Sequence, residues 1–163
     1  MRLLTLIATL TTTSIFGVAA TQADPWGPES PNFNLEAILR PAAGGPSQGF
    51  GLVRFRQPND ETKIVYLTTW IRDLSPEQGY YLQRATDTTV DDNCAGTNWL
   101  TLGQGPLPQA ITADEAGTGR AALWRDLAAI PLGMKFDIHF RIVDAATSAV
   151  VLESGCYQFT VSM

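Results

Sequence analysis

Apolar and polar residues alternate through most of the chain after residue 32, which is the pattern of β-strands that bury one face. The clearest alternation runs over residues 135–143, where Phe136, Ile138, Phe140 and Ile142 share one face. Similar patterns, separated by turns rich in glycine, proline and aspartate, predict further strands over residues 33–39, 50–56, 62–72, 80–84, 99–102, 149–153 and 156–161. Residues 111–119 are predicted to be the end of a strand followed by a glycine-rich turn.

One stretch, residues 120–130, is ambiguous. Its alanine, leucine and arginine content favours a helix, and Leu123, Leu127 and Ile130 have helical spacing. The neighbouring segments are all extended, so we interpret this stretch as a strand followed by a bend or a short helix. The sequence leaves the choice between strand and helix open.

About eight strands with turns between them predict an all-β fold, which we expect to be an antiparallel Greek-key sandwich. An immunoglobulin-like sandwich is one possible form. Against it, the chain lacks the Cys…Trp…Cys spacing and has no tyrosine two residues before Cys156. No internal repeat interrupts the pattern, so residues 33–163 are expected to form a single domain.

Residues 1–23 have the features of a secretory signal peptide. Arg2 gives a positive start, residues 3–20 carry no charge and are mostly apolar, and small residues follow. We expect cleavage after Ala23, and an uncleaved membrane anchor is the alternative. Residues 24–32 contain three prolines and are expected to be an irregular lead-in to the domain.

Composition narrows the classes of function. The chain has 163 residues, of which 45% are hydrophobic and 17% charged, and its net charge is −5. This balance is typical of a folded protein, and the acidic charge argues against binding to nucleic acid or to an anionic membrane. We expect a secreted or extracellular protein, or a periplasmic or cell-surface one, without membrane association once the signal peptide is removed. Its partner is expected to be another extracellular protein or a small ligand.

Cys94 and Cys156 are the only cysteines in the sequence. Export would place them in an oxidising compartment, where such a pair forms a disulfide. A metal site built on them would need more ligands than the one histidine can add. The sequence therefore predicts a disulfide between a mid-chain loop and the last strand.

The one histidine, His139, lies on the polar face of the strand at residues 135–143. Asp137 and Arg141 share that face because side chains two positions apart in a strand point the same way. One interpretation is a general base oriented by Asp137, or a metal ligand. The other is a solvated face with alternating charges, which cross-strand pairing favours. We expect the solvated face, no catalytic residue and no cofactor.

Four oxygen-bearing residues, Asp87, Asp91, Asp92 and Asn93, stand just before Cys94. Calcium binds several such oxygens, so Asp91 and Asp92 are candidate metal ligands beside His139. The spacing is not that of an EF-hand loop, however, and aspartates are common in exposed turns. We expect these residues to be solvated turn residues.

Aromatic side chains are the third candidate site. Tyr80 and Tyr81 are adjacent, so a strand sends them to opposite faces, and an exposed one could join Trp99 in a platform for a sugar or another flat ligand. Trp70 and Trp124 are further members of this aromatic set, although aromatic residues in strands more often lie in the core. No basic cluster is expected beside these aromatics, which argues against stacking with nucleic acid.

The order of features resembles the copper/zinc superoxide dismutase family over roughly residues 50–161. In that family a Leu-x-Pro-x-Gly turn leads into a strand with copper-binding histidines, and a cysteine in a long loop bonds to a cysteine in the last strand. Here Leu74-Ser-Pro-Glu-Gln-Gly79 leads into residues 80–84, Cys94 follows, and Cys156 lies near the end. The resemblance implies a sandwich of that type.

The sequence departs from this family at the metal site. Residues 80–84 read Tyr-Tyr-Leu-Gln-Arg where the family has its copper histidines, and His139 alone stands where the last copper ligand lies. A shared fold would therefore lack the dismutase chemistry. We expect a secreted, non-catalytic domain with a binding or structural role. The alternatives are a metal-binding or redox protein that uses His139, and a carbohydrate or small-ligand binder that uses exposed aromatics.

Overall fold

The structure is a computed structural model that describes residues 33–45, 48–58 and 62–162. The predicted signal peptide, residues 1–23, and the lead-in, residues 24–32, lie outside this part of the chain. No helix among the described residues is long and apolar enough to cross a membrane.

The described residues form twelve strands and no helix, so the predicted all-β class is confirmed. The strands are β1 (Phe33–Pro41), β2 (Phe50–Gln57), β3 (Ile64–Arg72), β4 (Gly79–Asp87), β5 (Leu100–Thr101), β6 (Gly103–Gln104), β7 (Leu107–Pro108), β8 (Ile111–Thr112), β9 (Gly119–Asp126), β10 (Lys135–Asp144), β11 (Val150–Ser154) and β12 (Tyr157–Thr160).

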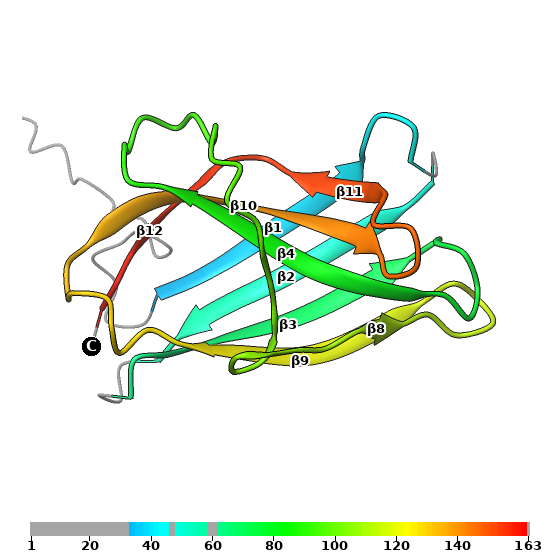
Figure 1. Cartoon of the computed structure of the whole chain (residues 1–163), viewed down its shortest axis with the longest axis horizontal. Coiled ribbons are helices and arrows are strands. Elements are labelled where there is room, and N and C mark those ends of the chain that lie inside the picture. Colours follow the sequence, from blue (N-terminus) through cyan, green and yellow to red (C-terminus); the bar gives the residue numbers. More distant parts are fainter. Residues whose placement is uncertain (1–32, 46–47, 59–61, 163) are drawn as a thin grey trace, which may run out of the picture.

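All the described strands belong to one mixed sheet that nearly closes into a barrel (Figure 1). The main path runs β5-β4-β10-β11-β1-β2-β3-β9-β6-β7, with β12 added to β10 and β8 added to β4. The pairing of β6 with β9 is parallel and the other ladders are antiparallel. The arrangement differs from the expected eight-stranded sandwich because short strands in the loops add to the sheet and join its two halves.

One seam of the barrel lies where the last strands meet β1. β11 bridges β10 and β1 at one end of the barrel, and β12 continues along β10 at the other. There the Tyr157 hydroxyl accepts the N–H of Ile38 at 3.1 Å. The buried Gln57 side chain accepts the Ser162 N–H at 3.1 Å and donates to the Ser162 carbonyl. These side chains replace backbone pairing where the ladder is incomplete.

The second seam joins β4 to β9 through the segment at residues 100–112. β5 and β8 pair with β4, and β6 pairs with β9. Gly105 lies against Trp124, where a Cβ atom would approach the indole ring to 2.6 Å, and its backbone adopts a φ of +61°. A glycine is therefore required for this segment to lie flat on β9.

The barrel interior is filled by alternate residues of the long strands. Phe136, Ile138, Phe140 and Ile142 are all buried, as their alternation predicted. Across the interior the Phe55 ring of β2 contacts Phe159 of β12, with ring centroids 4.7 Å apart. The two sides of the sheet therefore pack directly on each other.

Residues 120–130 are not helical. The strand β9 continues to Asp126, and a bend follows in which the Ile130 N–H donates to the Leu127 carbonyl at 2.8 Å. Pairing of β9 with β3 along its whole length overrides the helical propensity of alanine and leucine. The interpretation as a strand followed by a bend is confirmed.

We predict that Gln57→Ala lowers the free energy of unfolding by about 2 kcal/mol, because it leaves the Ser162 N–H and carbonyl at the seam without partners. Chemical denaturation of the purified protein measures this change. Gln158→Ala is the matched control, since both Gln158 and its hydrogen-bond partner Asp92 are exposed, and we expect a change within about 0.5 kcal/mol. Equal effects of the two variants would contradict the role of Gln57.

Candidate functional site

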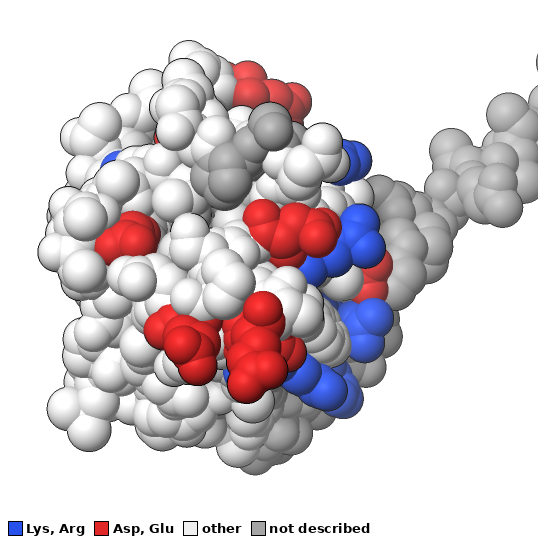
Figure 2. All heavy atoms as spheres, turned by 90° about the vertical axis from the view of Figure 1, so that its right-hand side faces the viewer, with Lys and Arg blue, Asp and Glu red and all other residues white. Residues whose placement is uncertain are grey.

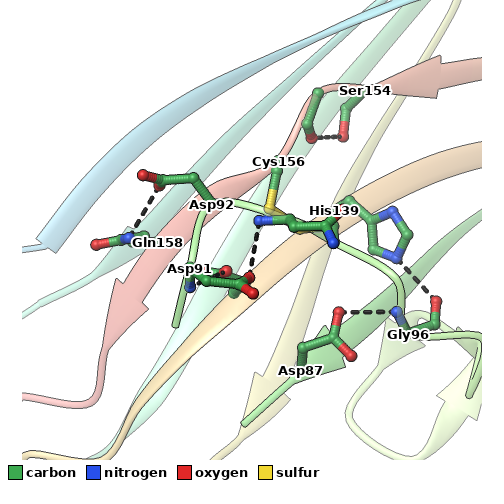
Figure 3. Close-up of a disulfide and its surroundings, with 12 residues drawn as sticks. Asp87, Asp91, Asp92, Gly96, His139, Ser154, Cys156 and Gln158 are labelled. Atoms are coloured by element: carbon green, nitrogen blue, oxygen red, sulfur yellow. Dashed lines mark hydrogen bonds between the residues drawn. A yellow bond between two sulfur atoms is a disulfide. The ribbon is translucent and has the colours of Figure 1, made fainter. Parts of the chain in front are cut away.

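A disulfide fixes the long loop between β4 and β5, residues 88–99, over the outer face of β4 and β10 (Figure 3). We call this segment the covering loop. Cys94 and Cys156 are bonded, which is the predicted pairing, and Cys156 lies directly before β12. Gly96 lies directly against the sheet, since a Cβ atom there would lie 2.8 Å from the Thr86 carbonyl oxygen. The disulfide fits an oxidising compartment.

The acidic residues of this loop hold the loop itself. Asp87 accepts the Gly96 N–H at 2.7 Å, and Asp91 accepts the Asn93 N–H at 3.1 Å. Asp92 accepts a hydrogen bond from the Gln158 amide at 2.9 Å (Figure 3). Because these carboxylates bind different partners, the loop does not gather them into a calcium-binding arrangement.

The outer face of β10 is not the solvated face that we expected. Asp137 is completely buried, and its Oδ2 accepts the Asp91 N–H at 3.0 Å. His139 and Arg141 are half-buried, and the pKa of Arg141 is lowered by burial, against an opposing effect of Glu153. The loop that covers these residues comes from elsewhere in the chain, so the alternation within β10 could not reveal it.

His139 is turned toward the loop and not toward Asp137. Its Nε2 donates to the Gly96 carbonyl at 3.1 Å, which assigns a hydrogen to Nε2 because a carbonyl only accepts. Among the described residues no hydrogen bond joins His139 to Asp137. No group of three or more histidine, cysteine, aspartate or glutamate side chains in the described part of the chain could hold a metal ion.

The aromatic candidates separate as well. Tyr80 and Tyr81 point to opposite faces, as predicted, but Tyr80 is buried and its hydroxyl accepts the Ser75 N–H at 3.0 Å. Trp99 lies over His139 and Arg141, with its ring centroid 3.9 Å from the guanidinium carbon of Arg141. Its ring is therefore engaged within the protein, and the buried Tyr80 does not join it.

The structure instead contains a cavity inside the barrel, at the end formed by the loop between β9 and β10. It encloses about 220 Å³. Most of its lining is apolar and comes from the inner faces of the strands, including Phe55, Leu67, Phe136, Ile138 and Phe140. The cavity reaches the surface at the β9–β10 loop, where Ala129, Pro131 and Met134 are exposed.

Two arginines line this cavity, Arg84 of β4 and Arg125 of β9. The alternation within each strand could have identified them. Arg84 follows the buried Tyr80 and Leu82 at a spacing of two, and Arg125 follows the buried Leu123 in the same way. Neither arginine is among the candidate residues predicted from the sequence, because those are catalytic and metal-binding residue types and aromatics, and not charges at inward positions.

The side chains of Arg84 and Arg125 bond only to neutral acceptors in the described part of the protein. Arg84 donates to the Thr86 hydroxyl at 3.1 Å, and Arg125 donates to the Gly105 carbonyl at 3.1 Å. The ion pairs among the described residues lie elsewhere, at Arg54–Glu36 and at Arg72–Asp73. Burial, and to a smaller extent the charge of Arg125, lower the pKa of Arg84.

The outer face of β1, β2, β3 and β9 corrects another expectation. Arginines do lie beside half-buried aromatics on this face, because Arg54 and Arg120 stack on Trp70, at 5.6 and 4.8 Å from the ring centroid. Arg40 and Arg72 lie over Phe50 in the same way. Strand pairing gathers these residues from four separate segments, so no local run of basic residues appears in the sequence. We call Arg40, Arg54, Arg72, Arg120, Phe50 and Trp70 the arginine–aromatic face.

Acidic residues collect at the end of the barrel that faces the viewer in Figure 2, while lysine and arginine lie along its side. Asp144 is the last residue of β10 and precedes the turn to β11. Hydrogen bonds from Thr147, the backbone N–H above all, and from the Ala146 N–H lower the pKa of Asp144. The Asp144 carboxylate therefore caps this turn.

No protein-family model, no curated protein and no solved structure matches this chain.

We predict that Cys156→Ser lowers the free energy of unfolding by about 4 kcal/mol, because the disulfide closes a loop with a sequence separation of 62 residues. Denaturation of the oxidised protein, the reduced protein and the variant measures this change. The reduced protein and the variant should unfold at the same lower denaturant concentration. An unchanged midpoint after complete reduction would contradict the prediction.

Proposed function

We propose that this protein is a secreted, non-catalytic binding protein that holds a small, largely apolar molecule inside its barrel. The observation that carries the proposal is the cavity of about 220 Å³ at the end near the β9–β10 loop. Barrels of about eight strands have an interior that side chains either fill or leave open for one small ligand. Apolar pockets of this kind with a few polar groups are the usual form of small-molecule sites.

The size of the cavity limits the ligand. A water-sized or methylene-sized group takes about 30 Å³, so the cavity accommodates roughly seven such groups. The lining residues Phe55, Phe136 and Phe140 offer ring surfaces to an aliphatic or aromatic body. A compact hydrocarbon body of six to nine carbons is therefore the size we propose, at roughly one carbon for each such group.

Two further expectations are part of the proposal. The disulfide between Cys94 and Cys156 supports export to an oxidising compartment. The turn before β4, the cysteine in the covering loop and the second cysteine before β12 support a superoxide-dismutase-like Greek-key relationship. Under that relationship the protein keeps the architecture and uses the interior of the barrel, while Tyr80–Arg84 replace the metal-binding histidines.

We predict that 1-octanol binds the wild-type protein and raises its melting temperature, since a ligand at one hundred times its Kd stabilises the folded state by about 2.7 kcal/mol. Val65→Phe should abolish this shift, because Val65 is buried and lines the cavity, and the added ring would occupy the space. Differential scanning calorimetry with increasing 1-octanol measures the shift.

Val53→Phe is the matched control. Val53 is equally buried, on the adjacent strand β2, but it does not line the cavity. This variant should lose stability through overpacking and keep its response to 1-octanol. A full response in Val65→Phe, or no response in the wild type, would contradict binding in the cavity.

A second candidate function is favoured by the arginine–aromatic face, which we propose binds an acidic polysaccharide. Stacking on Phe50 and Trp70 uses the flat sides of the Arg40 and Arg120 guanidiniums and leaves their N–H edges available for carboxylate or sulfate groups. The other two arginines of the face, Arg54 and Arg72, already pair with Glu36 and Asp73. The net charge of the protein does not prevent this, because charges more than about 8 Å away are screened at physiological salt.

We predict that Arg120→Gln elutes from a heparin column at a lower salt concentration than the wild type, because it removes one guanidinium from Trp70. Lys135→Gln is the control, since it makes the same charge change on an exposed residue of β10, away from the face. It should elute with the wild type. Equal loss in both variants, or no retention of the wild type at low salt, would contradict this function.

A further inference from the structure

Arg84 and Arg125 give the cavity a chemical preference that its volume and apolar lining alone do not. Both side chains stand at inward positions, on β4 and β9, which the segment at residues 100–112 joins at the second seam of the barrel. Each provides five N–H donors. Each makes one side-chain hydrogen bond among the described residues, to Thr86 and to Gly105.

An arrangement of two like charges in an apolar cavity is costly without a counter-charge. Burial removes water from a guanidinium, and a second guanidinium nearby repels it. The same two effects lower the pKa of Arg84. Because neither arginine has a carboxylate at ion-pair distance in the described part of the chain, an anion in the cavity would relieve both costs.

The rest of the cavity fixes the shape of such an anion. Phe136, Ile138 and Phe140 of β10 and Leu67 of β3 provide apolar walls, and the opening lies at Ala129–Met134. A ligand with charges at both ends would place one of them against these walls. The ligand therefore has one anionic group and one apolar body.

We propose that the cavity binds a small aliphatic monocarboxylate, with its carboxylate on Arg84 and Arg125 and its chain between the phenylalanines. The planar carboxylate suits guanidinium donors, which pair with it through two parallel hydrogen bonds. This proposal rests on the function proposed above, because it requires that the cavity takes up a ligand. It adds the chemical class of that ligand and the two residues that select it.

The test compares two probes of equal chain length, octanoate and 1-octanol, by isothermal titration calorimetry on the folded, disulfide-bonded wild-type protein at neutral pH. Octanoate should bind at least tenfold more tightly than 1-octanol, since hydrogen bonds to charged groups contribute about 1.5–3 kcal/mol each. If both bind with equal Kd, the carboxylate preference is overturned and cavity binding stands. If neither binds, both proposals are overturned.

Variants assign the preference to the two arginines. Arg84→Met and Arg125→Met keep an apolar chain of similar length, so each should weaken octanoate at least tenfold and leave 1-octanol unchanged or tighter. Arg141→Met is the control, because Arg141 lies outside the barrel against Trp99, and it should bind octanoate like the wild type. Circular dichroism checks that both cavity variants are folded like the wild type. If the folded variants still bind octanoate with the wild-type Kd, the assignment to the two arginines is overturned. If one of the two arginine variants does not fold, the other variant and the comparison of octanoate with 1-octanol on the wild type still test the proposal.

Discussion

In a sheet that nearly closes on itself, every long strand has one face toward a shared interior and one face toward the outside. The seams set this geometry here, with Gln57 and Tyr157 on one side and the segment at residues 100–112 on the other. Once the seams are closed, the position of each residue in the alternation decides its surroundings. A charge at an inward position has no route to bulk water except through the open end of the barrel.

The two ends of the barrel interior differ in how the inward positions are filled. Toward the end where β8 joins the sheet, Tyr80, Leu82 and Ile142 fill the space and are buried. Toward the other end, Arg84 and Thr86 take the next inward positions of β4, and Arg125 takes one on β9. The cavity lies at this end, between these polar side chains and the apolar residues of β2, β3 and β10. The cavity and the two arginine charges therefore occur at the same end of the interior. A purely structural role would not favour this combination.

The sequence predicted the strands well because alternation is a property of neighbouring residues. Residues 135–143 illustrate both its success and its limit. The inward set from Phe136 to Ile142 was predicted correctly, whereas Asp137 was expected in solvent and is completely buried. Its burial depends on the loop that Cys94 fastens near Cys156, a contact between distant segments that no local pattern contains. The arginine–aromatic face was missed for the same reason, since four strands contribute to it. Arg84 and Arg125 are a different case, because their spacing of two residues from the inward Leu82 and Leu123 could be read from the sequence.

The covering loop also decides which outer face remains available. It occupies the outside of β4 and β10, where Trp99 contacts both His139 and Arg141 and the Gly96 N–H donates to Asp87. The outside of β1, β2, β3 and β9 has no such cover among the described residues, and its arginines are held in place by Phe50 and Trp70. Strand β9 contributes Arg120 to that face and Arg125 to the cavity, at positions of opposite parity. A substitution at one of these arginines changes one surface and leaves the side-chain contacts of the other intact, so the two binding surfaces can be separated within a single strand.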